Sequence, residues 1–272
     1  MKTEITALML VKNSVQGKGL PLLTKVVEQT SKITKEILVI DNGSEDDTVK
    51  QLKLLQNKLQ LNMEIVEDKN KNYNSLRVKY AKKKIKTRYV LVVDDDEIAT
   101  EGLIRCILRE GRKYHIVNTK WNTYMHNKKL LESRRIYLVD LKNVELNKNI
   151  TGPHQGFVSA ETFKKIPRKY ILRPKEELKH YSFKDVETLV KKTKRYAKAE
   201  SEVLFMKNPK LNTLQVVFLL LFEVIRQLTY RTLLQKGYKT KLGMFFSLHN
   251  AISYEIDKYL FYVELQMKNK ER

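Results

Sequence analysis

The chain has 272 residues, and its 53 Lys and Arg against 31 Asp and Glu give a formal net charge of +22. Hydrophobic residues make up 42% of the sequence, which is enough for a sizeable core and excludes a disordered tail protein. The single cysteine, Cys106, excludes a disulfide framework, and no Cys/His cluster predicts a zinc site. We expect one large domain, or one domain with an appendage, in a reducing compartment.

Short apolar runs alternate with helical patterns through the first hundred residues, which predicts βαβ units and a parallel sheet. Gly43 and Ser44, followed by Asp47, predict a tight turn and a capping box at the start of the second helix. The expected strands are 5–11, 36–40, 63–66 and 89–93, and the expected helices are 20–31, 47–60 and 74–86.

After Asp96 this alternation changes. Residues 142–183 show no regular pattern, so loops are expected there. The expected elements before them are a helix at 101–113, strands at 116–124 and 135–139, and a polar turn at 126–129.

From residue 183 onward the whole sequence predicts helix. The expected helices are 185–207, which is strongly charged, 211–236, which is mostly apolar, and 242–267, which is amphipathic. We therefore divide the chain into an α/β domain, residues 1–182, and a helical, basic region, residues 183–272.

The sequence predicts neither a secretory signal nor a membrane span. Only seven weakly apolar residues follow Glu4, and the longest apolar run, 214–225, is interrupted by Gln215 and Glu223. The protein is expected to be soluble or to lie on a membrane surface. Residues 164–272 are the more basic part, at +13, and charge alone does not choose between an anionic lipid surface, a phosphate-bearing substrate and nucleic acid.

Asp41 ends an apolar run and is followed by the turn residues Asn42, Gly43 and Ser44. In an open parallel sheet, ligands bind beyond the carboxyl ends of the strands, so Asp41 is expected to face the ligand crevice. A carboxylate there can accept a hydrogen bond from a base N–H or a ribose hydroxyl. The same residues would also suit an ordinary strand-to-helix turn, and this segment alone leaves both interpretations open.

Four consecutive acids, Asp94, Asp95, Asp96 and Glu97, follow the apolar run 89–93. In an extended chain, side chains at i and i+2 share a side, which predicts that Asp94 and Asp96 converge. Two convergent carboxylates suit Mg²⁺ or Mn²⁺, which could bridge nucleotide phosphates and neutralise a pyrophosphate leaving group. The alternative is a solvated acid cluster, but four unneutralised acids would repel one another, so we favour the metal site.

Taken together, these segments resemble the family 2 glycosyltransferases with the GT-A fold. Asp94-Asp95-Asp96-Glu97 resembles the D-x-D-E motif of that family. The segment from His180-Tyr181-Ser182 to Glu200 is similar to the branch that includes lipopolysaccharide-core glucosyltransferase-like proteins. The resemblance runs in order through residues 9–13, 39–48, 72–77, 91–97, 180–200 and 236–264.

The resemblance implies a Rossmann-like, mostly parallel sheet flanked by helices, with a C-terminal helical appendage. It implies a nucleotide-sugar donor, with a UDP-sugar as the first candidate, and Mn²⁺ or Mg²⁺. His180 is implied as a metal or phosphate contact, although it could equally cap the following helix. The implied donor-binding residues are Lys12, Asn13, Asp41, Asn42, Arg77, Asp94 and Asp95, and the implied metal ligands are Asp94, Asp96 and His180.

The sequence departs from the family at the expected catalytic base. A His-Glu pair commonly precedes the last loop in that branch, whereas this chain has His154-Gln155. A glutamine cannot take the acceptor proton that an inverting transfer must remove. Glu97 and His154 are the candidate bases, with Glu132 and Glu161 as further acids, although His154 could also be an ordinary loop residue.

The apolar residues of the 211–236 helix share one face and are flanked by basic residues. This pattern predicts a core, an interface for a homo-oligomer, or a helix lying on an anionic membrane.

The expected function is a metal-dependent, inverting glycosyltransferase acting in the cytoplasm on a cell-envelope glycan or lipid-linked acceptor. Attachment to the inner face of the plasma membrane is left open. No nucleic-acid partner is expected because the lysines are dispersed and the sheet edge is acidic. The alternatives are a basic nucleic-acid-binding protein and a degenerate glycosyltransferase that binds a nucleotide without turnover.

Overall fold

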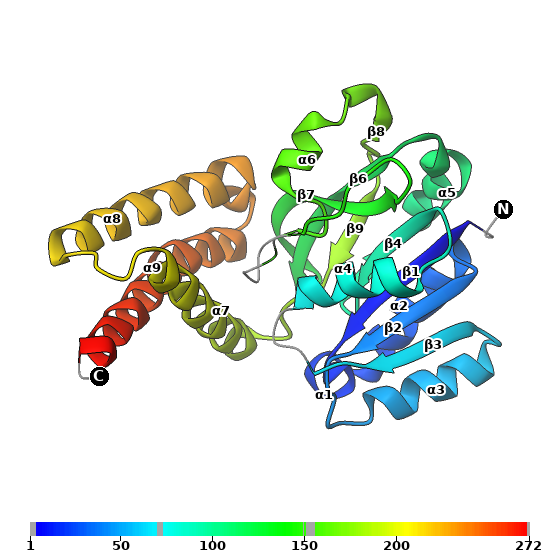
Figure 1. The fold of residues 1–272 in the computed structure, drawn as a ribbon, viewed down its shortest axis with the longest axis horizontal. Coiled ribbons are helices and arrows are strands. Elements are labelled where there is room, and N and C mark those ends of the chain that lie inside the picture. The colour runs from blue at the N-terminus through cyan, green and yellow to red at the C-terminus, as the bar shows by residue number, and fades with distance from the viewer. Residues whose placement is uncertain (1–3, 70–72, 149, 151–155, 271–272) are drawn as a thin grey trace. The chain divides into compact units, whose positions relative to one another are not determined.

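The structure is a computed structural model that describes residues 4–69, 73–148, 150 and 156–270 (Figure 1). The described chain divides into two compact units. The second unit consists of Ser182 onward together with Thr123–Ser133, and the remaining described residues form the first unit.

The first unit is built on a mixed, mostly parallel sheet. The order of the nine strands formed by the described residues is β3-β2-β1-β4-β7-β6-β9-β5, with β8 beside β6. β1 pairs in parallel with β2 and β4, and β2 with β3, so the carboxyl ends of these four strands lie at one edge. β7 runs antiparallel to β4, and β5 runs antiparallel to β9. The strands are β1 (Ile5–Val11), β2 (Glu36–Asp41), β3 (Asn62–Glu67), β4 (Tyr89–Asp94), β5 (Glu97–Ala99), β6 (Ile116–Met125), β7 (Lys128–Asp140), β8 (Ile171–Leu172) and β9 (Glu177–His180).

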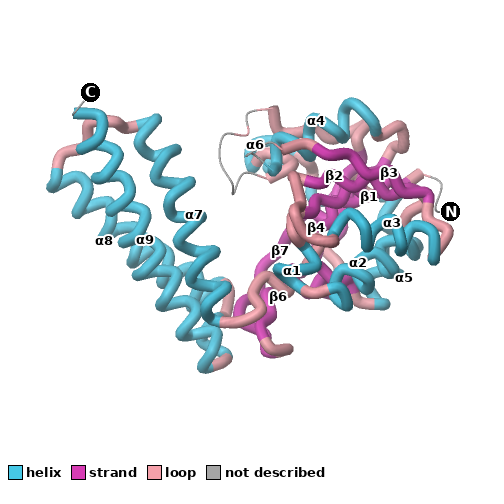
Figure 2. Tube along the Cα trace, turned by 90° about the horizontal axis from the view of Figure 1, so that it is seen from below, coloured by secondary structure: helices cyan, strands magenta, loops and turns pink. Residues whose placement is uncertain are grey.

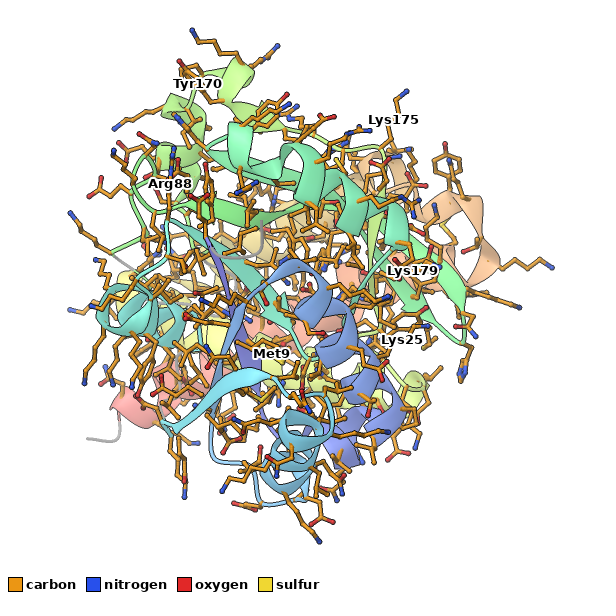
Figure 3. All side chains as sticks on the ribbon, turned by 90° about the vertical axis from the view of Figure 1, so that its right-hand side faces the viewer. Met9, Lys25, Arg88, Tyr170, Lys175 and Lys179 are labelled. Carbon is orange, nitrogen blue, oxygen red and sulfur yellow. The ribbon has the colours of Figure 1, made fainter. Side chains whose placement is uncertain are left out.

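Helices cover both faces of the parallel strands, which explains why β1, β2 and β4 are apolar at nearly every position, whereas β3 at the edge of the sheet is half polar. Ala7 and Met9 of β1 belong to the core that α2, α3 and α5 cover, whereas Leu8 belongs to the core on the α4 side. Met9 lies inside the unit while Lys25 points outward (Figure 3). The helices are α1 (Ser14–Lys18), α2 (Leu20–Ile33), α3 (Thr48–Lys58), α4 (Tyr73–Lys84), α5 (Glu101–Glu110) and α6 (Ala160–Lys165), with 3-10 turns at Gly111–Lys113 and Arg168–Tyr170.

Three long helices make up most of the second unit (Figure 2). α7 (Val186–Lys207) and α8 (Thr213–Thr229) both pack on α9 (Lys241–Lys270). A π-helical turn, Tyr230–Leu234, and a 3-10 turn, Gly237–Lys239, join α8 to α9. The tip of the β6–β7 hairpin packs here, in a core formed by Met125, Leu130, Leu131, Leu189 and Phe246.

The first four strands and the three helices predicted between them, α2, α3 and α4, lie where the sequence predicts them, within three residues at each end. The capping box at Ser44 is wrong, because α3 begins at Thr48 and the Ser44 hydroxyl bonds Asp41 instead. The strand expected at 135–139 begins at Lys128. His126 and Asn127 both have positive φ, 47° and 58°, which suits a tight hairpin turn and lets β7 start directly after it.

The region expected to be irregular, 142–183, contains α6, β8 and β9. The helix expected at 211–236 is confirmed, as α8 and the π-helical turn that continues it to Leu234. Thr213–Leu234, with 22 residues and a mean hydropathy of 1.3, is the one helix among the described residues that is long and apolar enough to cross a membrane. That finding rests on length and composition only.

Candidate active site

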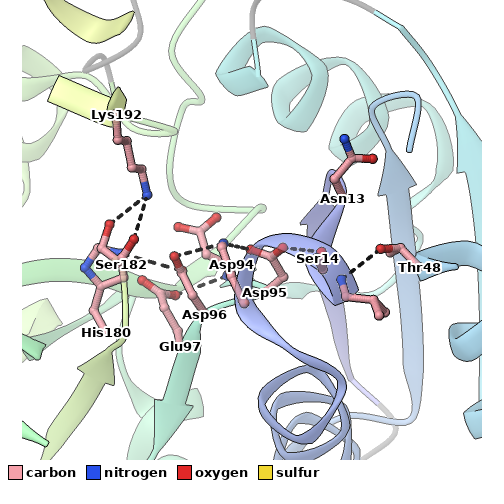
Figure 4. Close-up of polar contacts among 12 residues, drawn as sticks. Asn13, Ser14, Thr48, Asp94, Asp95, Asp96, Glu97, His180, Ser182 and Lys192 are labelled. Atoms are coloured by element: carbon pink, nitrogen blue, oxygen red, sulfur yellow. Dashed lines mark hydrogen bonds and ion pairs between the residues drawn. The ribbon is translucent and has the colours of Figure 1, made fainter. Parts of the chain in front are cut away.

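The loops that follow β1 and β2 are tied together at the carboxyl edge of the sheet (Figure 4). Ser44 Oγ accepts a hydrogen bond from the Asn13 backbone N–H at 2.9 Å, and Asn13 Oδ1 accepts from the Glu45 N–H at 2.8 Å. Val15 N–H donates to Thr48 Oγ1 at 3.1 Å. Asn13 has a left-handed backbone with φ 48°, which asparagine tolerates better than most residues. The two loops therefore form one braced edge.

Asp41 and Asn42 support this edge from β2. Asp41 is 2% exposed, and its two carboxylate oxygens accept from the Ser44 N–H at 3.2 and 3.1 Å. The Asn42 side-chain amide donates to the Asp68 carbonyl at 2.8 Å, which ties the loop after β3 to the same edge. Lys12 is exposed beside them.

The acid cluster does not continue as an extended strand. Asp95 and Asp96 form a turn between β4 and β5, so the alternation argument that placed Asp94 and Asp96 together does not apply. The carboxylate of Asp94 is contacted by the guanidinium groups of Arg77 in α4 and Arg135 in β7.

Asp95 and Asp96 have different partners. Lys18 Nζ lies 2.9 Å from Asp96 Oδ2 and also contacts Asp95, which accepts a further hydrogen bond from the Ser14 hydroxyl. His180 Nε2 lies 3.5 Å from Asp96 Oδ1. Asp96 is thus the acid that lies between a lysine and a histidine.

Most of the cluster is buried, and neighbouring cations offset most of its negative charge. Asp95, Asp96 and Glu97 are 5, 3 and 1% exposed. Three cations contact the four acids in the described part of the chain, so the local charge is 3 − 4 = −1 when all four acids are ionised and the histidine is neutral. Burial alone would lower the pKa of Lys18, but the charges of Asp96 and Asp95 outweigh it and raise that pKa. Burial, reinforced by the charge of Arg135, lowers the pKa of Arg77 to about 10.

Glu97 is held from several sides. Oε2 accepts from the Asp94 N–H at 3.1 Å, Oε1 accepts from Trp121 Nε1–H at 2.6 Å, and the guanidinium of Arg135 contacts Oε1. Burial raises the pKa of Glu97 to about 7, and the charge of Arg135 opposes this rise. A general base must reach the acceptor hydroxyl, and a carboxylate this enclosed does not present itself to one. Its observed contacts position Arg135 and Trp121.

His180 ends β9 directly opposite Glu97 of β5. Its ring stacks on Trp121, with ring centroids 4.3 Å apart and an interplanar angle of 23°. The alternative that His180 caps the following helix is wrong. The N-cap of α7 is Asp185, whose side chain accepts from the Thr188 N–H at 2.7 Å.

Asp96 and His180 together offer one oxygen and one nitrogen donor to a divalent cation. No group of three or more acidic, His or Cys side chains within the described parts of the chain is arranged to hold a metal ion. Mg²⁺ in nucleotide sites needs only one or two protein ligands, since phosphates and water complete its shell, and Mn²⁺ accepts nitrogen as well as oxygen donors. The pair therefore fits such an ion, whereas the Asp94 oxygens are engaged by two arginines.

Several contributors have little or no local sequence signal. Arg135 shows one weak sign, as a charge beside the apolar run 136–139, while Lys18 is one of 40 lysines. Trp121 stands out only as the single tryptophan. His154 and Gln155 lie outside the described residues. Glu161 is exposed in α6 and pairs with Lys165 at 2.6 Å, and Glu132 belongs to the second unit.

A separate hollow of about 570 Å³ lies beside the braced loops. Its lining includes Glu45, Asp46 and Asp47, together with Val15 and Gln16. Three acids make it unfavourable for a diphosphate, so it does not compete with the acid cluster as a donor site.

The sheet, its helical cover and the acid cluster after β4 define a GT-A glycosyltransferase fold. The mannosyltransferase PcManGT from Pyrobaculum calidifontis, solved with GDP-Man and Mn²⁺, superposes with a TM-score of 0.55 at 12% identity, over 97% of this chain and 88% of that chain. TarS residues 1–349 from S. aureus, solved with UDP-GlcNAc, gives a TM-score of 0.48 at 12% identity, over 99% of this chain and 92% of that chain.

Residues 9–167, more than half of the chain, match the sequence model of glycosyl transferase family 2. The chain therefore belongs to glycosyl transferase family 2 and is a nucleotide-sugar-dependent glycosyltransferase. No curated protein matches the sequence significantly.

Proposed function

We propose that this glycosyltransferase is metal-dependent and inverting, and that it moves a sugar from a nucleoside diphosphate donor to a cell-envelope glycan or lipid-linked acceptor. A UDP-sugar is the first candidate donor, and the cytoplasm is the expected location. Residues 1–182 would bind the donor and perform the transfer. The observation that carries the proposal is the buried, paired acid cluster at the carboxyl end of β4, with Asp96 beside His180.

Charge balance supports a role for a divalent cation. The cluster and its three cations sum to −1, and a bound Mn²⁺ or Mg²⁺ would change this local charge to −1 + 2 = +1. Asp96 and His180 would hold the ion, which supplies charge neutralisation for the diphosphate leaving group. The Mn²⁺ in the PcManGT complex is consistent with this assignment.

The braced edge would receive the nucleoside. Asp41 lies at the carboxyl end of β2, where a carboxylate can accept from a base or ribose group. Asn13 and Asn42 keep the surrounding loops in place, and Lys12 is exposed nearby. The guanidinium of Arg77 contacts Asp94, which places this cation beside the expected position of the donor phosphates. Because Glu97 is enclosed, we assign it to positioning Arg135, and His154 stays the candidate for the acceptor base.

The test is thermal unfolding of the full chain with Mn²⁺ and a panel of nucleoside diphosphates. A ligand at about 100 times its Kd stabilises the native state by about 2.7 kcal/mol. We expect one diphosphate to raise the midpoint of the wild type only when Mn²⁺ is present, and not to raise that of Asp96→Asn.

Asp47→Asn is the matched control, because Asp47 is an exposed acid close to the braced loops that makes no contact with the cluster. It should behave as the wild type. A diphosphate that stabilises Asp96→Asn as much as the wild type, or equally without metal, would contradict the metal assignment.

A further inference from the structure

One face of α8 presents large apolar side chains to solvent. Leu214, Phe218 and Ile225 are 81, 69 and 66% exposed. Their neighbours at three- and four-residue spacing are also exposed, so they form one continuous stripe along the helix. We call this surface the α8 stripe, and its members are Leu214, Val217, Phe218, Leu221, Phe222 and Ile225.

The opposite face of α8 already supplies the packing of the second unit. Val216 is 8% exposed and lies in a core with Tyr259 and Tyr262 of α9, against which Leu219 and Leu220 also pack. The α8 stripe is therefore not needed to hold α8 on α9. An apolar surface of this extent on a folded unit marks an interaction site.

Cations outnumber acids in the segment of chain that carries the stripe. Between Val203 and Tyr254 the chain carries seven Lys and Arg and one acid, Glu223, a balance of 7 − 1 = +6. The acid is paired with Arg226. Lys207 and Lys210, just before α8, are exposed. Of the four cations that follow α8, Lys241 is exposed, Arg231 is partly buried, and Lys236 and Lys239 contact Glu132.

An exposed apolar stripe beside an excess of cations distinguishes between three possible partners, which are a second copy of the chain, nucleic acid and a lipid bilayer. A second copy of the chain would bring two segments of +6 together, which like-charge repulsion opposes. Nucleic acid would use the cations and could stack bases on Phe218 and Phe222, but it would leave the aliphatic members of the stripe without a partner. An anionic bilayer accepts both, because its interfacial region takes up apolar side chains and its headgroups attract Lys and Arg.

We infer that the α8 stripe inserts into the interfacial region of an anionic lipid bilayer, with the α8 axis parallel to the membrane plane. The parallel orientation follows from the packed face, since α8 can keep Val216 against α9 only if it does not cross the bilayer. Tyr230, 44% exposed at the end of α8, is the kind of side chain that lies at headgroup level. The inference does not depend on the donor, the metal or the acceptor.

Flotation with lipid vesicles tests this inference on the full chain. We expect the wild type to bind vesicles of equal parts phosphatidylcholine and phosphatidylglycerol, and to bind phosphatidylcholine alone much more weakly. Phe218→Ser/Leu221→Ser should weaken binding to the anionic vesicles on the order of 100-fold, because two large apolar side chains no longer insert. Leu54→Ser, which removes a 53% exposed leucine from α3, is the matched control and should bind as the wild type.

The contribution of the lysines to vesicle binding is measured with separate variants. Lys207→Gln/Lys210→Gln should weaken binding to anionic vesicles about 25-fold, as expected for the loss of two charges near the surface. Lys53→Gln/Lys58→Gln on α3, also exposed, is the control. All these side chains are exposed, so unfolding curves of the variants should overlay that of the wild type.

Orientation is measured with Leu214→Trp and Ile225→Trp, using lipids brominated at different depths. A parallel helix places both indoles at the same depth, whereas a spanning helix separates them by about 16 Å. Different depths would overturn the parallel orientation. The inference itself fails if Phe218→Ser/Leu221→Ser binds as the wild type, if neutral vesicles bind as well as anionic ones, or if the stripe instead forms a dimer in sedimentation equilibrium without lipid.

Discussion

Lys18 competes with any metal ion for Asp96. Its ammonium nitrogen is 2.9 Å from Asp96 Oδ2 and contacts Asp95 as well. A divalent cation held by Asp96 would place two cations, with three positive charges in total, at one carboxylate, where they repel each other. The Lys18 contact therefore stabilises the protein without metal and weakens its affinity for the ion.

Lys18→Met tests this competition. Removing one partner of a largely buried ion pair leaves an uncompensated carboxylate, so we expect the metal-free protein to lose about 3 kcal/mol of unfolding free energy. Mn²⁺ should then raise the unfolding midpoint of the variant more than that of the wild type. The measurement is thermal unfolding with and without Mn²⁺.

Lys25→Met is the control, since Lys25 is exposed on α2 and should change neither quantity. An equal Mn²⁺ shift in Lys18→Met and wild type would show that the ammonium group does not oppose the metal.

The sequence marked the acids of the site, and the family resemblance added Arg77 and His180, but Lys18 and Arg135 were missed for a physical reason. Asp94–Glu97 are adjacent in sequence and follow a buried run, so a local pattern marks them. Lys18 lies 77 residues from Asp95, and Arg135 lies 41 residues from Asp94. Only the sheet order, with β7 beside β4 and α1 after β1, brings these cations to the cluster.

At the scale of single elements, the tip of the β6–β7 hairpin is held by charge as well as by its apolar core. Glu132 accepts from Lys129 at 2.8 Å and from Lys236 at 2.6 Å, within the second unit. Burial alone would raise the pKa of Glu132, but the hydrogen bonds and charges of Lys129 and Lys236 outweigh it and lower the pKa to about 2.

This lowered pKa predicts how stability depends on pH. The unfolded-state pKa is close to 4.5, so the contribution of Glu132 is fully present above that pH and is lost as the pH falls towards 2. The midpoint difference between wild type and Glu132→Gln should be constant above pH 4.5 and shrink below it. Thermal unfolding across this range measures it.

Glu264→Gln, which breaks an exposed pair within α9, provides the comparison and should give a smaller difference. A wild-type advantage over Glu132→Gln that stays constant down to pH 2 would contradict the assigned pKa.

The same hairpin shows where sequence patterns fail for elements. The parallel strands were predicted well because burial on both faces makes them continuous apolar runs. The first half of β7 was missed because Leu130 and Leu131 are adjacent and both buried, at 2 and 5% exposed, so no alternation marks a strand. Their burial comes from α7 and α9, which follow much later in the chain.

At the scale of the whole molecule, a net charge of +22 does not predict nucleic-acid binding. The acid cluster and its cations nearly cancel, and the excess lysines are dispersed. We expect fluorescence anisotropy to detect oligonucleotide binding at low salt only, with loss of binding at physiological ionic strength because released counterions no longer favour it. Submicromolar binding that persists at physiological salt would instead support a nucleic-acid partner.

The family could be predicted from the sequence because its motifs occur in the right order along the chain, and the match over residues 9–167 confirms it. Thr123–Ser133 belong to the same compact unit as the residues from Ser182 onward, a grouping that no local pattern in the sequence indicates.

Because the tip of the β6–β7 hairpin packs in the second unit, it determines how the protein can be shortened. A chain truncated after Tyr181 would keep all nine strands but remove the helices that cover Met125, Leu130 and Leu131. The apolar side chains at the hairpin tip of the shortened protein would be exposed to solvent, and the protein would tend to aggregate during expression. Trimming the tip to a short turn in the same truncated chain should restore solubility, so a soluble catalytic fragment requires two edits to the gene.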